Sequence, residues 1–135
     1  MHEMPSLSAL KGATVTVSNS GTYPEPGAAS VQVLFSDGSS LRADYWRVVK
    51  GDKPDLSSFD HAQKYGLPEP VDAFTQLELE LRGKCVTEAL LDARTGDLVF
   101  SFEDDLEFRI FNFSGYEVWV IHFPNGTVEY SPYAK

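Results

Sequence analysis

The stretch Leu98-Val99-Phe100-Ser101-Phe102 decides the fold class, because a large apolar side chain occupies every second position. Such alternation is typical of a β-strand with one buried face. After the polar residues 103–105, the same alternation returns in residues 106–110. Two alternating runs joined by a short polar connection predict an antiparallel hairpin. The chain is therefore expected to consist mainly of antiparallel sheet.

An earlier part of the chain repeats this pattern. Residues 31–37 resemble residues 98–104, and three further blocks match in the same order. These blocks are residues 10–15 with 81–86, Leu41 with Leu106, and residues 46–48 with 119–121. Agreement in order favours an internal duplication over chance similarity between amphipathic strands. The first repeat is expected to cover about residues 1–58 and the second about 71–135, joined by the segment 59–70.

Each half is expected to begin with a helix and continue as a meander of about four strands. Residues 71–82 carry apolar side chains at helical spacing, preceded by Pro70 and followed by Gly83, which is a natural helix stop. They predict a helix. In the first half only residues 7–10 offer such a pattern, so its helix is expected to be short or absent.

Turn signals divide the strands. Asp37-Gly38 and Asn125-Gly126 are typical of tight hairpins. Residues 116–123 are mostly apolar on both faces, which predicts a strand inside a sheet. Residues 19–29 and 50–70 are rich in Gly, Pro and polar residues, and they are expected to form loops. Together these features predict one α+β domain over residues 1–135, dominated by antiparallel sheet, with its two halves related by a pseudo-two-fold axis.

Composition excludes several classes of function. The chain has 135 residues, 42% of them hydrophobic and 23% charged, as expected for a globular protein. Its formal net charge of −9 argues against binding nucleic acid. No apolar run is long enough to span a membrane and no secretory leader is visible, which favours a cytoplasmic protein. A single cysteine, Cys85, excludes an internal disulfide and a multi-cysteine zinc site.

The negative charge is concentrated in one half of the chain. Residues 1–58 have a net charge of −1 and residues 59–135 a net charge of −8. The densest acidic cluster contains Glu103, Asp104 and Asp105, with Glu107 close behind. The cluster has two interpretations. It is either a solvated turn or a surface that binds a basic protein partner.

The connecting segment contains a second candidate site. Asp60 and His61 place a carboxylate beside an imidazole, and Tyr65 adds a phenol four residues later. A carboxylate that orients an imidazole can produce a general base, so a small-ligand site or enzyme active site between the halves is one hypothesis. The alternative is that these polar groups only hold the backbone of their own segment.

Aromatic residues near Glu117 and the three histidines are further candidates for function. Tyr116 and Trp119 flank Glu117 and are expected either in the core or in an outward aromatic patch for a protein partner. His122, on a predicted strand, is expected to be partly buried and hydrogen-bonded. The three histidines lack the close spacing of a metal site, so no metal or cofactor is expected.

Five segments carry a resemblance to known proteins. They are Ser57-Ser58-Phe59-Asp60-His61, Tyr65-Gly66-Leu67-Pro68, Gly96-Asp97-Leu98, Phe111-Asn112-Phe113-Ser114-Gly115-Tyr116-Glu117-Val118-Trp119 and Pro124-Asn125-Gly126. Together they resemble a group of small uncharacterised bacterial proteins, most closely over residues 57–133. Small acidic proteins of this kind are often encoded near polymorphic toxins, so the resemblance implies an immunity role. It assigns no catalytic residue.

The leading hypothesis is therefore a non-enzymatic, immunity-type or accessory protein that binds a basic protein through an acidic surface. A small-ligand site or enzyme near Asp60 and His61 is the first alternative. A structural module that forms a homodimer is the second. The sequence leaves open whether the protein is a monomer or a homodimer.

Overall fold

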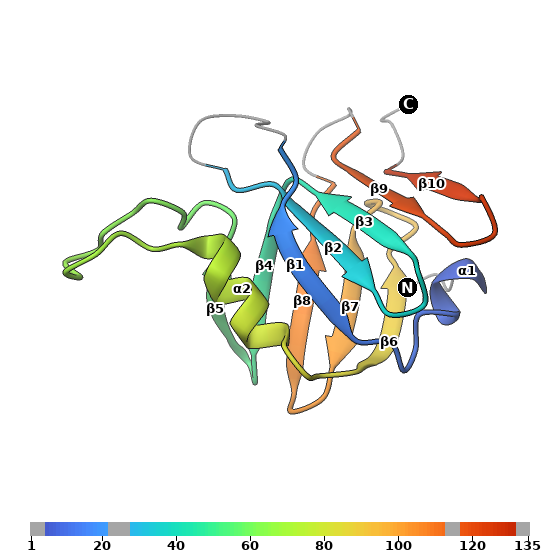
Figure 1. Ribbon diagram of the computed structural model, residues 1–135, viewed down its shortest axis with the longest axis horizontal. Helices are drawn as coiled ribbons and strands as arrows, with labels where there is room; N and C mark the ends of the chain where they lie inside the picture. Colours follow the sequence, from blue (N-terminus) through green and yellow to red (C-terminus); the bar gives the residue numbers. More distant parts are fainter. Residues whose placement is uncertain (1–4, 22–27, 113–116, 132–135) are drawn as a thin grey trace.

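The computed structural model describes residues 5–21, 28–112 and 117–131, and it contains two five-stranded antiparallel sheets and two helices (Figure 1). The first sheet has the order β1-β2-β3-β9-β10 and the second the order β5-β4-β8-β7-β6. The first sheet consists of β1 (Val15–Asn19), β2 (Val31–Phe35), β3 (Ser40–Ala43), β9 (Trp119–His122) and β10 (Val128–Tyr130). The second consists of β4 (Trp46–Lys50), β5 (Lys53–Ser57), β6 (Val86–Leu91), β7 (Leu98–Phe102) and β8 (Leu106–Ile110). The predicted dominance of antiparallel sheet is confirmed.

The two halves of the chain exchange strands. Each sheet contains the first three strands of one half of the chain and the last two strands of the other half. The first sheet combines β1, β2 and β3 with β9 and β10, and the second combines β6, β7 and β8 with β4 and β5. After β3 the chain crosses into the second sheet, and after β8 it crosses back into the first. The halves are therefore not two separate four-strand meanders, as the sequence pattern predicted, but contain five strands each and share both sheets.

The core lies between the sheets, which are arranged one in front of the other (Figure 1). Val31, Val33 and Phe35 point inward from the first sheet, as their alternation predicts. Phe35 meets Phe100 of the second sheet with ring centroids 5.7 Å apart. The inward faces of both sheets belong to one cluster of buried apolar side chains, whose burial drives the packing of the two layers.

Two buried tryptophans mark the points where the chain changes sheets. Trp46 is the first residue of β4, and its indole Nε1–H donates to the Ala29 carbonyl at 2.8 Å. Its backbone N–H donates to the Ser58 hydroxyl at 3.2 Å, and the Ser58 N–H donates back to the Trp46 carbonyl at 3.0 Å. Every polar group involved is buried, so these bonds replace those that water would make.

Trp119 is anchored in the same way at the start of β9. Its Nε1–H donates to the Gly96 carbonyl at 2.9 Å. The Ser131 hydroxyl accepts the backbone N–H groups of Val118 at 2.8 Å and Trp119 at 3.4 Å. Ser131 in turn donates its N–H to the Trp119 carbonyl at 3.0 Å. In both cases the strand that begins at the tryptophan, β4 or β9, is thus tied to the serine that directly follows the next strand, β5 or β10.

The helices contact three of the four edge strands, β1, β5 and β6. α2 (Ala73–Leu81) contacts β1 and β5 and buries Ala73, Leu77 and Leu81, whereas the short α1 (Pro5–Ser8) contacts β6. α2 starts two residues later than predicted, because Val71 pairs with residues 62 and 63 in the connecting segment. Its first turn is capped by Asp72, which accepts the Thr75 N–H.

The edge strands β5 and β10 are interrupted or short. β5 contains Pro54, and its ladder with β4 shifts register between Val48 and Val49. β10 has only three residues. A proline, a bulge and a short edge strand each oppose pairing with another chain.

The described strands correct two smaller predictions. The region 50–70 is not all loop, because residues 53–57 form β5. His122 is exposed rather than partly buried, because it lies at the outward position at the end of β9. The hairpins at Asp37-Gly38 and Asn125-Gly126 are confirmed, and both glycines have positive φ angles, 97° and 90°.

Removal of either serine anchor should destabilise the fold. We expect Ser131→Ala and Ser58→Ala each to lower the free energy of unfolding by about 1–3 kcal/mol, because each leaves a buried backbone N–H without an acceptor. Urea unfolding followed by tryptophan fluorescence measures the change. Ser18→Ala, on the exposed outer face of β1, is the matched control and should change it little. Equal stability of all three variants would contradict the anchoring role.

The helix cap should make stability depend on acidic pH. The Thr75 backbone N–H lowers the pKa of Asp72 below its ordinary value of 3.8. The stabilisation from its carboxylate is therefore present above pH 3.8 and is lost as the pH falls through the lowered native value. Asp72→Ala should cost about 1 kcal/mol at pH 7. Urea unfolding at pH 7 and pH 3 should show this cost shrinking at the lower pH, and a cost that grows instead would contradict the assignment.

Candidate functional site

The structure places the predicted site residues in three separate regions. Asp60, His61 and Tyr65 lie in the connecting segment, which projects from one side of the molecule (Figure 1). Glu103, Asp104 and Asp105 form the turn between β7 and β8. Glu117 and Trp119 belong to the approach to β9 and to β9 itself, and Tyr116 lies outside the described residues. The three groups therefore do not converge on a single site.

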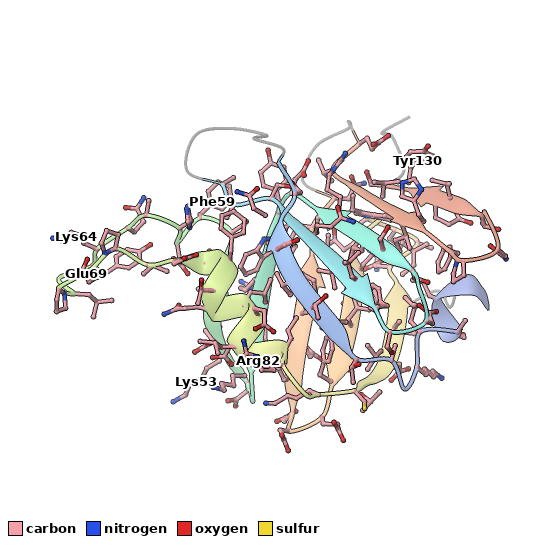
Figure 2. The ribbon with its side chains drawn as sticks, in the orientation of Figure 1. Lys53, Phe59, Lys64, Glu69, Arg82 and Tyr130 are labelled. Carbon is pink, nitrogen blue, oxygen red and sulfur yellow. The ribbon has the colours of Figure 1, made fainter. Side chains whose placement is uncertain are left out.

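The connecting segment folds back on itself as a projecting arm, residues 61–71. Ala62 N–H donates to the Val71 carbonyl, and Val71 N–H donates to the Gln63 carbonyl, both at 2.8 Å. Residues 62–70 are exposed, including Tyr65 (67%) and Leu67 (51%). Figure 2 shows Phe59 at the base of the arm and Lys64 and Glu69 at its far end.

Asp60 and His61 stabilise the base of this arm. Asp60 accepts the Ser57 N–H and the Tyr65 hydroxyl, each at 2.8 Å. The hydrogen bond to Asp60 raises the pKa of Tyr65. The Nδ1 atom of His61 accepts the Ala73 N–H at 3.2 Å. Its ring meets Phe74 edge-on, with centroids 4.8 Å apart.

These contacts limit what the pair can do chemically. The Asp60 carboxylate contacts Tyr65 rather than the imidazole, so it does not orient His61 as a general base. In residues 5–21, 28–112 and 117–131, no serine, threonine or cysteine side chain is hydrogen-bonded to His61. The arrangement is that of polar groups that hold the backbone of their own segment.

The acidic turn lies at the opposite end of the second sheet from the crossings (Figure 1). Glu103 accepts the Cys85 N–H at 2.8 Å, and Lys84 lies 3.7 Å from Asp104. Asp104 and Asp105 are exposed and both have positive φ angles, 64° and 59°. The Asp105 carbonyl accepts the Gly51 N–H at 2.9 Å, which places the neighbouring turn with Asp52 beside this one.

The residues near β9 divide between surface and core. Glu117 is half-buried and pairs with Arg42 at 3.5 Å, and Arg42 also contacts the buried Asp44 at 3.2 Å. Trp119 is completely buried and its indole donates to Gly96, so of its two predicted places it occupies the core. It does not form part of an outward binding patch.

A hollow of about 610 Å³, which the sequence did not predict, lies at the end of the second sheet, next to the crossings. Its walls come from both halves of the chain. They include the side chains of Tyr45, Arg47, Phe59, Asp97, Phe111 and Asn112. The available signal was that Arg47 alternates with the core residues Trp46 and Val48, which by itself indicates only an outward position.

Among residues 5–21, 28–112 and 117–131, no three His, Cys, Asp or Glu side chains lie close enough together to hold a metal ion. No helix in that part of the chain is long and apolar enough to cross a membrane.

Comparison with known proteins finds no match to a family model, a curated protein or a solved structure. The resemblance to small bacterial proteins therefore stays a prediction from the sequence.

Loss of the Asp60 carboxylate should loosen the arm without unfolding the sheets. We expect Asp60→Ala to speed trypsin cleavage after Lys64 several-fold, because Ser57 N–H and the Tyr65 hydroxyl both lose their acceptor. Timed digestion with mass spectrometry measures the rate. Glu69→Ala, at the far end of the arm, is the control. Equal cleavage of both variants would show that Asp60 does not hold the arm.

Proposed function

We propose that the protein is a non-enzymatic binding protein that contacts a basic protein partner through its acidic turn. The observation that carries the proposal is the pair of exposed aspartates, Asp104 and Asp105, held next to Asp52 by the Gly51–Asp105 hydrogen bond. Lys84 compensates only part of this charge. An uncompensated acidic surface accelerates association with a basic partner and makes it sensitive to salt.

We also infer that the two halves are copies of one ancestral unit. The matching strand orders and the matching Trp46–Ser58 and Trp119–Ser131 anchors support this inference. The pairing partners also refine the predicted alignment. Leu41 lies opposite Val33 as Phe108 lies opposite Phe100, so Leu41 corresponds to Phe108 rather than to Leu106.

The alignment of the halves sets the acidic turn beside its counterpart, the turn between β2 and β3. The turn of the first half contains Asp37 and Gly38, and Gly38 adopts its positive φ without steric cost. In the equivalent turn of the second half, Asp105 occupies the position of Gly38. A carboxylate kept where glycine would be less strained favours a role for the charge rather than for the turn.

The alternatives receive less support. The contacts of Asp60 and His61 are those of a structural tie, so an active site at this pair is disfavoured. A homodimer formed by strand pairing would need a long, regular edge. In the described strands, β5 is interrupted by Pro54 and a register shift, and β10 has only three residues. An immunity role in the cytoplasm stays part of the proposal, because it rests on the sequence resemblance.

The test is capture of partners from lysate of the source cell at low and at high salt. We expect a basic protein that is retained at low salt and released at high salt. Asp104→Asn with Asp105→Asn should reduce its retention at least tenfold, since asparagine tolerates positive φ and removes only the charge.

The control variant carries Glu69→Gln with Glu88→Gln. It removes the same number of charges from other exposed positions and should retain the partner. If the two double variants bind equally well, or if no protein is captured, the proposal is wrong.

A further inference from the structure

We propose that the hollow beside the crossings binds a small carboxylic acid with an aromatic body, and that Arg47 holds its carboxylate. The inference is independent of the proposed protein partner, because the acidic turn lies at the other end of the same sheet.

The walls of the hollow provide a flat apolar surface. Tyr45 and Phe59 are stacked, with ring centroids 5.8 Å apart and an angle of 20° between the rings. Phe111 also lines the hollow, beside Tyr45, and the volume of about 610 Å³ lies in the usual range for small-molecule sites. Aromatic walls of this kind favour a planar apolar ligand body.

Arg47 provides the one strong polar feature. Its guanidinium lies over the Phe111 ring, 5.3 Å from the centroid, and its side chain is half-buried. Its Nε–H is buried and has no hydrogen-bond partner. An unsatisfied buried donor on a charged group costs free energy. Since this atom is closed to solvent, a carboxylate would meet the terminal N–H groups of the guanidinium and offset part of that cost electrostatically.

The absence of an ion pair distinguishes Arg47 from three of the four other arginines of the chain, the exception within the described residues being the exposed Arg94. Within the described residues, no carboxylate lies within 4.0 Å of Arg47, although the protein is strongly acidic. Three other arginines have such partners: Arg42 with Asp44 and Glu117, Arg82 with Glu78, and Arg109 with Glu107.

The neighbouring charges leave the positive charge of Arg47 available. Arg109 lies directly opposite Arg47 on β8, and like charges in this position repel each other. Glu107 bonds to Arg109 through two hydrogen bonds of 2.9 and 2.8 Å, so it compensates Arg109. Asp97 accepts the Asn112 N–H at 2.7 Å and thereby fixes the rim of the hollow.

The shape of the donor selects a carboxylate. A guanidinium offers parallel N–H groups that match the two oxygens of a carboxylate. Because Phe111 supports one face of the guanidinium, its edge is the part left to meet an acceptor. A ligand whose apolar body lies against these aromatic side chains and whose carboxylate reaches Arg47 would satisfy both features.

The test titrates the whole protein with naphthalene-2-carboxylate and with its uncharged analogue naphthalene-2-carboxamide, followed by ¹H–¹⁵N NMR. We expect saturable shifts of the Arg47 side-chain Nε–H and of the Phe111 amide with the acid, and at least tenfold weaker binding of the amide. Arg47→Gln should weaken binding of the acid at least tenfold.

Two further variants control for folding and for charge. Arg82→Gln, an equal charge change on α2, should leave binding unchanged (Figure 2). If Arg47→Gln fails to fold, Phe111→Leu takes its place as the test. It removes one aromatic side chain from the hollow and should weaken the binding of both compounds. The proposal is overturned if acid and amide bind equally, if a folded Arg47→Gln variant binds like the unchanged protein, or if neither compound gives saturable shifts.

Discussion

Two buried indole N–H groups hold the parts of the chain on which the rest of the structure depends. Trp46 and Trp119 stand where the chain leaves one sheet and enters the other, and each indole is bonded to a carbonyl just before another strand. The two crossing segments are also hydrogen-bonded to each other. Asp44 N–H donates to the Val118 carbonyl, and Phe111 N–H donates to the Tyr45 carbonyl. Without these bonds, buried backbone groups at the crossings would have no hydrogen-bond partner, because water does not reach them.

The crossings also create the hollow. They bring Tyr45, from the first half, next to Phe111, from the second, although the two residues are far apart in the sequence. The acidic turn, in contrast, is built at the far ends of β7 and β8, where the hairpin alone positions it. The two proposed sites therefore have different structural origins, and a change at one need not alter the other.

Local sequence pattern predicted most of the elements, although not β5, and it did not predict the exchange of strands between the sheets. Alternation in residues 98–102 predicted β7 and its pairing with β8, and helical spacing predicted most of α2. The exchange of strands was missed because inward-facing residues of β4 and β9 have the same pattern whichever sheet they join. Arg47 was missed for a related reason. Alternation shows that it points outward, and only the crossing places Phe111 beneath its guanidinium.

The most direct test of the central claim is hydrogen exchange of the two indole Nε1–H groups, which are the only two in the chain. The anchoring role predicts that both exchange only through global unfolding, with the same protection as the slowest backbone amides of the core strands. Rapid exchange of either indole, at the rate of a solvent-exposed tryptophan, would show that this crossing is not anchored as described.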